Sequence, residues 1–160
     1  MSDVTSVSIG PVLVGQTPPG FTVEQAKPQV TLNQPFGDAP NLTLLGYDLV
    51  EPVDLPDPVK ITLYWRTEAP LATDYTTYLH VRNAAGETIV QQDQPPLQGA
   101  YPTSLWHPGE IIADEIVFSW PARLPEDGYE LVVGLYDLKT GQRLSVAGNP
   151  ANEVVLVKGE

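Results

Sequence analysis

The segment YPTSLWHPGE, residues 101–110, gathers several side chains that could recognise a sugar. The apolar face of a pyranose packs on an aromatic ring, and its hydroxyls bond to polar groups at the edge of that ring. An aromatic platform in this segment would need exposed rings, and two outward-facing tyrosines on neighbouring strands could extend it. The candidate binding residues are Tyr101, Trp106, His107, Tyr64 and Tyr78.

The same segment has a structural interpretation, which we favour. A long connection over a sandwich has to bury something if it is to stay in place. Trp106, flanked by Pro102 and Pro108, would serve that purpose from within the core. The exposure of Trp106 therefore separates a binding loop from a closing loop.

Catalytic constellations are difficult to assemble from this sequence. Ser104, His107 and Asp114 could be written as a Ser-His-Asp set, but no nucleophile elbow surrounds the serine. Phosphate-binding glycine loops are also absent. We expect a non-enzymatic chain without a cofactor, and a hydrolase is the least favoured alternative.

Metal binding has few ligands to draw on. The chain has no cysteine, so a zinc site would need both His80 and His107 together with carboxylates. Calcium prefers six to eight oxygen ligands, which acidic loops can supply. The weak calcium candidates are Asp54, Asp57, Glu126 and Asp127, whose spacing matches no known calcium loop. We therefore expect no metal centre.

Asp114 shares strand parity with the apolar residues Ile112, Ile116 and Phe118. A carboxylate on such a face is costly unless it is bonded. We expect it at the rim of the fold, where it would accept backbone N–H groups or pair with a cation and anchor the 101–110 loop. The alternative is a catalytic acid with a raised pKa.

The elements that would position these residues are short strands separated by turns. The chain contains 17 prolines and 13 glycines, and Val59, Ile61, Leu63 and Trp65 alternate with polar residues. The pattern predicts an all-β, immunoglobulin- or fibronectin-III-like antiparallel β-sandwich of about eight or nine strands without a long helix. The expected strands are 41–50, 59–68, 74–81, 87–93, 111–120, 128–137, 142–146 and 153–157, with weaker candidates at 4–9, 11–14 and 29–32.

The expected domain organisation is simple. Residues 1–28 form a Pro-rich N-terminal extension with weak strands, and residues 29–160 form a single sandwich. Tyr129 is expected to form a tyrosine corner, in which the hydroxyl bonds back to nearby backbone. Trp65 is expected in the core.

Charge and hydropathy exclude several partners. The formal net charge of −12 disfavours nucleic acid and anionic lipid surfaces. No stretch has the roughly 20 apolar residues of a membrane helix, and the N-terminus lacks the pattern of a signal peptide. The chain is expected to be extracytoplasmic as a domain of a longer protein, and cytoplasmic if these residues are all of it.

Several segments in order resemble a known module. They are FGDAPNLTLLGYDL, LYWRTEAPLATDYTTYLHV, YPTSLWHPGE, LPEDGYELVVGLYD and TGQRL, within residues 36–146. Together they resemble a β-sandwich module that follows the membrane region of bacterial glycosyltransferases of the protein mannosyltransferase type. The resemblance implies an extracytoplasmic location and carries no catalytic residues with it.

Three functions remain open at this point. The first is a non-catalytic accessory domain that binds glycan. The second is a structural or protein-interaction domain of a larger extracytoplasmic or membrane-anchored protein, which would show buried aromatics and an exposed edge strand or apolar patch. The third is a hydrolase, which would need a cleft that gathers Asp114, His107 and Ser104.

Overall fold

The fold is an antiparallel β-sandwich, as the sequence predicts. The structure is a computed structural model and describes residues 26–39, 41–50 and 54–160. Its strands are β1 (Val30–Phe36), β2 (Leu42–Val50), β3 (Pro58–Thr67), β4 (Tyr75–Asn83), β5 (Thr88–Gln94), β6 (Ile111–Ser119), β7 (Tyr129–Asp137) and β8 (Val154–Gly159). The only helical elements in these ranges are the short 3₁₀ turns η1 (Pro96–Gly99) and η2 (Thr103–Leu105).

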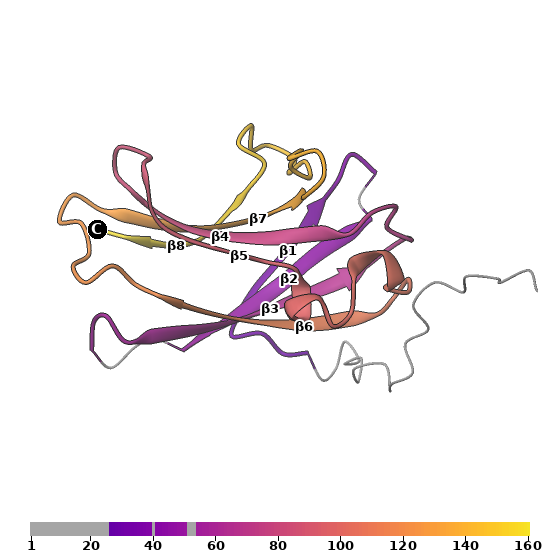
Figure 1. The fold of residues 1–160 in the computed structure, drawn as a ribbon, viewed down its shortest axis with the longest axis horizontal. Coiled ribbons are helices and arrows are strands. Elements are labelled where there is room, and N and C mark those ends of the chain that lie inside the picture. Colours follow the sequence, from indigo (N-terminus) through magenta and orange to yellow (C-terminus); the bar gives the residue numbers. More distant parts are fainter. Residues whose placement is uncertain (1–25, 40, 51–53) are drawn as a thin grey trace, which may run out of the picture.

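The strands form two four-stranded antiparallel sheets that lie face to face (Figure 1). Sheet A has the order β1-β2-β3-β6, and sheet B has the order β5-β4-β7-β8. β2, β3 and β6 occupy the places of strands A, B and E in an immunoglobulin-type sandwich, and β4, β7 and β8 those of C, F and G. The described part of the chain contains no helix long and apolar enough to cross a membrane.

β3 shows why the sequence makes this fold. Val59, Ile61, Leu63 and Trp65 are each 0% exposed, whereas Lys60 on the other face is exposed. Strand geometry sends alternate side chains to opposite faces, so this pattern buries one face and solvates the other. Trp65 lies in the core as predicted, with its ring edge-on to that of Phe36 at a centroid distance of 5.3 Å.

The turn after β4 also follows from its sequence. Gly86 has a φ of +81°, a conformation that glycine adopts without strain, and its N–H donates to the Asn83 carbonyl at 2.9 Å. The Asn83 side-chain oxygen accepts the N–H of Glu87 at 2.9 Å. The predicted hairpin between β4 and β5 is therefore confirmed.

Three predicted strands do not appear among the strands that the structure describes. Residues 142–146 form only isolated bridges, from Arg143 to Tyr136 and from Val146 to both Phe36 and Asn149. That strand prediction was wrong, because the segment runs across the fold to β1 instead of continuing along β7. The strand candidates 4–9 and 11–14 lie outside the described residues, and the domain boundary at residue 28 stays a prediction.

Candidate functional site

The 101–110 segment is a closing loop. Tyr101 and Trp106 are each only 3% exposed, and the Trp106 Nε1–H donates to the Tyr101 carbonyl at 2.9 Å. Both residues belong to the main hydrophobic core. The prediction of a sugar platform on these two rings was wrong, because a ring inside the core has no free face. The structural alternative describes Trp106 correctly.

Polar contacts fix the same loop from its outer side. The Tyr101 hydroxyl lies 2.9 Å from a Glu110 carboxylate oxygen and 3.0 Å from the Leu105 carbonyl. Burial, together with the Glu110 carboxylate, raises the pKa of Tyr101 to about 12. The Glu110 carboxylate also accepts the backbone N–H of His107 at 2.9 Å, while the His107 side chain stays 79% exposed. A hydrogen bond between Tyr101 and Glu110 thus joins the first and last residues of the loop.

The structure does not assemble the Ser-His-Asp set. The Ser104 N–H donates to Asp74, and no hydrogen bond joins Ser104 to His107. Asp114 is 0% exposed between the two sheets, and its partner is the Leu97 N–H at 2.9 Å. The prediction that Asp114 lies at the rim and anchors the 101–110 loop was therefore wrong, because Asp114 holds η1.

Burial has a clear electrostatic effect on Asp114. Desolvation raises its pKa from 3.8 to about 6, against the smaller lowering effects of the Leu97 N–H and the Thr77 hydroxyl. Oδ2 of Asp114 and Oγ1 of Thr77 are both buried without a partner in hydrogen-bond geometry. The carboxyl is thus held by a single good hydrogen bond.

The two candidate tyrosines outside the loop lie on opposite sheets. Tyr64 is half-buried on the outer face of sheet A, where its hydroxyl donates to Asp48 at 2.7 Å. Tyr78 is on the outer face of sheet B and is only 1% exposed. They cannot form one platform with each other or with Trp106.

A different group of polar side chains meets on the outer face of sheet B, and we call it the polar face. It combines side chains of β4, β5 and β7 with two from the connection between β7 and β8, which lies above that sheet in Figure 1. Its residues are Tyr78, His80, Arg82, Asp93, Tyr136, Arg143 and Glu153.

An arginine–carboxylate pair lies within the polar face. Arg82 binds Glu153 through both guanidinium nitrogens, with Nη2 at 2.6 Å from Oε2, and the Glu153 side chain is only 5% exposed. Such two-point pairing fixes both groups in one plane. Arg143 bonds to the same carboxylate at 3.5 Å, and its guanidinium lies 4.5 Å from the centre of the Tyr78 ring. Glu153 therefore organises both cations.

A second set of contacts surrounds Asp93. Its carboxylate accepts hydrogen bonds from the Tyr136 hydroxyl and the Gln91 amide, each at 3.2 Å. His80 Nε2 lies 3.2 Å from the other oxygen. Burial lowers the pKa of His80, and the bond to Asp93 opposes that effect only in part, so the imidazole is neutral at neutral pH. With Nε2–H as the donor, Nδ1 is a buried acceptor without a partner.

Two apolar residues, Gly134 and Val155, border the polar face. Gly134 lies beside Tyr78 in the β4–β7 register, and a Cβ added there would come within 2.2 Å of the Tyr78 oxygen. Only glycine lets this ring lie flat across β7. Val155 pairs with Val132 at the other side of the polar face and is 41% exposed. One exposed apolar side chain, Val155, thus lies next to fixed polar groups.

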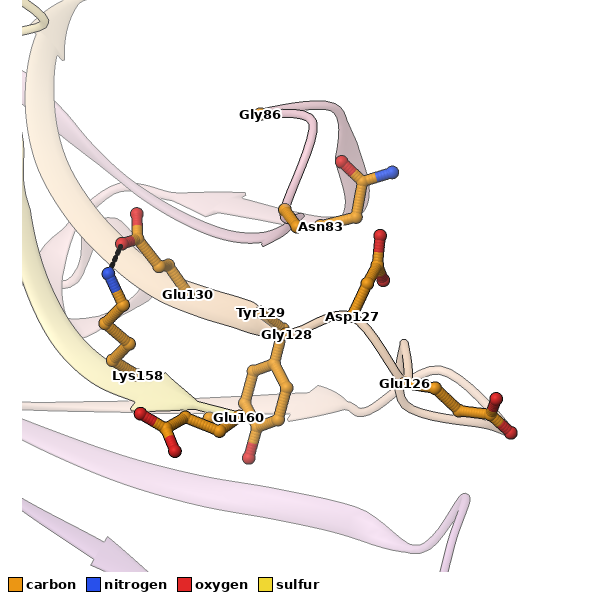
Figure 2. Close-up of a pocket in the computed structure, with 11 residues that line it drawn as sticks. Asn83, Gly86, Glu126, Asp127, Gly128, Tyr129, Glu130, Lys158 and Glu160 are labelled. Atoms are coloured by element: carbon orange, nitrogen blue, oxygen red, sulfur yellow. Dashed lines mark ion pairs between the residues drawn. The ribbon is translucent and has the colours of Figure 1, made fainter.

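A hollow of about 460 Å³ lies at one end of the sandwich, between the β4–β5 turn and the start of β7 (Figure 2). It includes the calcium candidates Glu126 and Asp127. Their carboxyl groups point apart, and the Glu130 carboxylate is paired with Lys158 at 3.2 Å. Among the described residues, no group of three or more His, Cys, Asp or Glu could hold a metal ion, including the candidates Asp54 and Asp57 and the pair His80 and His107.

Tyr129 has a structural role that differs from the predicted one. The described residues offer its hydroxyl no hydrogen-bond partner, so the tyrosine corner is not formed there. Its ring instead packs edge-on against Trp120 at a centroid distance of 5.4 Å and covers Gly159, where a Cβ would come within 2.0 Å. Tyr129 therefore packs over the last residue of β8.

Comparison with known proteins gives a structural similarity alone. No protein-family model matches the chain, and no curated protein matches it. The sandwich is similar to the crystal structure of the C-terminal domain of wzt, with a TM-score of 0.44, 11% sequence identity, and coverage of 82% of this chain and 76% of that chain. A similarity of that size carries no functional argument. The resemblance to the glycosyltransferase-associated module stays a prediction.

The polar face was not predicted as a unit. The alternation of Tyr78, His80 and Arg82 on one side of β4 is a signal in the sequence that could have indicated it. The partner Glu153 lies 71 residues from Arg82 along the chain, and no local pattern marks it. Only the topology brings these residues together.

Proposed function

We propose that this domain is a non-catalytic accessory module that binds glycan through the polar face. The observation that carries the proposal is the fixed pair of partly exposed groups, Asp93 and Arg143, next to the exposed Val155. The buried Glu153 holds Arg143 in place from below. Carboxylate, guanidinium and imidazole groups bond well to sugar hydroxyls, and an apolar side chain can contact the C–H face of the ring.

Preorganisation supports the same proposal. Each immobilised side chain costs free energy on binding, so groups already held in one geometry bind with less loss. Glu153 holds Arg82 and Arg143, and Asp93 holds His80 and Tyr136. The polar face therefore needs little rearrangement to accept a ligand.

The proposal extends to the protein that contains the domain. We infer that the chain is part of a larger extracytoplasmic protein whose activity, if it has one, resides elsewhere. The resemblance of residues 36–146 to a module beside membrane glycosyltransferases supports this placement. In that setting, glycan would be presented on the same side of the membrane as the sandwich.

Binding to an array of soluble oligosaccharides tests the proposal. The Tyr136→Phe variant removes a hydroxyl bonded to Asp93, and Tyr64→Phe removes the equivalent hydroxyl bonded to Asp48 on the other sheet. We expect wild type and Tyr64→Phe to bind the same oligosaccharides, and Tyr136→Phe to bind them at least several-fold more weakly. Equal losses in the two variants, or no binding by any, would contradict the proposal.

One observation favours a second candidate, a protein-interaction domain. β6 is an edge strand of sheet A and pairs with β3 over nine residues without a register shift, and Val117 on its outer face is 52% exposed. A long regular edge can accept a strand from another protein. Substitution Val117→Lys would weaken such pairing and leave glycan binding unchanged.

A further inference from the structure

Asp114 is a buried acid at a junction of three elements. It lies on β6 opposite Leu63 of β3, faces Thr77 of β4 in the other sheet, and accepts the Leu97 N–H of η1 at 2.9 Å. It is 0% exposed, and Oδ2 has no hydrogen-bond partner within the described part of the chain. A carboxylate in this position has lost most of its hydration and regained one bond.

Among the residues that the structure describes, no cation compensates for a negative charge on Asp114. β4 presents the Thr77 hydroxyl, η1 presents a backbone amide, and β3 presents an apolar side chain. On β5, the Gln94 amide bonds to the Glu115 carbonyl, and Glu115 itself pairs with Lys60 on the outer face of sheet A. Within the described ranges, the influences on the Asp114 pKa are burial, the Leu97 N–H and the Thr77 hydroxyl, and none of them is a charged group.

The η1 turn is the strained, solvent-exposed part of this junction. Leu97 and Gln98 have φ values of +52° and +55°, which are left-handed conformations that cost energy for residues with a Cβ. Gln98 and Gly99 are exposed, and no other hydrogen bond from the described residues reaches the Leu97 N–H. Asp114 therefore holds a strained turn in place.

We propose that Asp114 is a proton-controlled latch on η1, which is tight while the carboxyl is protonated and opens to water when it ionises. The neutral acid can sit between the sheets without a charge to solvate and still accept the Leu97 N–H. Hydration stabilises the anion more than its single hydrogen bond from the Leu97 N–H does, and η1 is the nearest element that can admit water.

The direction of the pH response follows from the two protonation states. Burial raises the pKa of Asp114 from 3.8 to about 6 in the closed form, whereas in an open, hydrated form it returns toward its ordinary value. The closed form thus binds the proton more tightly, and opening becomes more favourable as the pH rises from about 4 to about 6 and levels off above that range. Two pKa units correspond to about a hundredfold change in the opening equilibrium.

Hydrogen exchange of the Leu97–Ala100 amides, corrected for the intrinsic exchange rate, tests the latch between pH 4 and 8. We expect the opening equilibrium of the wild type to rise by ten- to a hundredfold over this range and then level off. Asp114→Asn keeps the acceptor for Leu97 and cannot ionise, so its opening equilibrium should stay flat. The same rise in both proteins would overturn the proposal.

A second variant guards against misfolding of Asp114→Asn. Thr77→Val keeps the shape of the side chain and removes the hydroxyl that lowers the Asp114 pKa. We expect the midpoint of the exchange profile, and of the Asp114 carboxyl signal followed by ¹³C NMR, to move to higher pH. A carboxyl signal that titrates near pH 4 in the wild type would refute the latch without any variant.

Discussion

Replacing Trp106 by alanine measures how strongly the 101–110 loop is anchored. The ring is 3% exposed in the core, and its Nε1–H donates to the Tyr101 carbonyl. Deletion of a buried tryptophan ring typically costs about 3–5 kcal/mol, which includes the cavity that remains. We expect a loss of that size in the free energy of unfolding, or roughly 6–20 °C in Tm for a chain of this length.

Trp106→Phe separates the two parts of this effect. Phenylalanine keeps most of the packing and removes the donor to Tyr101, so about 1–2 kcal/mol should be lost. Leu105→Ala is the matched control from the same turn, because Leu105 is 40% exposed and should contribute less than about 1 kcal/mol.

Urea unfolding followed by circular dichroism gives these free energies, and linear extrapolation applies if the slopes agree between variants. The order of losses should be Trp106→Ala, then Trp106→Phe, then Leu105→Ala. A loss below about 1 kcal/mol in Trp106→Ala would refute the closing role of the ring. It would restore the possibility that the ring faces a ligand.

Three further predictions concern other buried groups. The wild type should lose up to about 3 kcal/mol of unfolding free energy between pH 4 and 6, because the raised pKa of Asp114 makes the folded state most stable when this carboxyl is protonated. Asp114→Asn should not show this loss, and thermal unfolding of both proteins from pH 4 to 8 measures the difference. Glu153→Gln should lower the unfolding free energy by about 3 kcal/mol, since it leaves Arg82 without its buried carboxylate. Lys60→Gln, which breaks an exposed ion pair, is the control in chemical denaturation, and a larger loss in Lys60→Gln than in Glu153→Gln would contradict this. Gly134→Ala should cost about 1–3 kcal/mol through its clash with Tyr78, and a double-mutant cycle with Tyr78→Ala should show coupling between the two sites.

Local patterns were sufficient to predict the strands and the sandwich. The alternation in β3 places its apolar side chains in the core, and the Asn83–Gly86 turn has the chemistry of a tight hairpin. Residues 142–146 were misassigned because a short alternating run does not reveal whether a neighbouring edge continues alongside it.

The candidate site was predicted much less well. Strand parity placed Asp114 on an inward face, yet the cost of burying a carboxylate led us to expect it at the rim. Aromatic content alone drew attention to Tyr101 and Trp106, although apolar rings are also the residues that a core recruits. The pairing of Arg82 with Glu153 depends on how β4 and the β7–β8 connection pack, which no segment of the sequence encodes by itself.

Mapping of amide chemical shifts during titration with the oligosaccharide that binds best on the array tests the central claim most directly. Binding at the polar face predicts shifts that concentrate on the outer-facing residues of β4, β5 and β7, around His80, Asp93 and Val132, and that weaken in Tyr136→Phe. Shifts confined to the hollow near Asp127, to the β6 edge, or absent throughout would contradict the account.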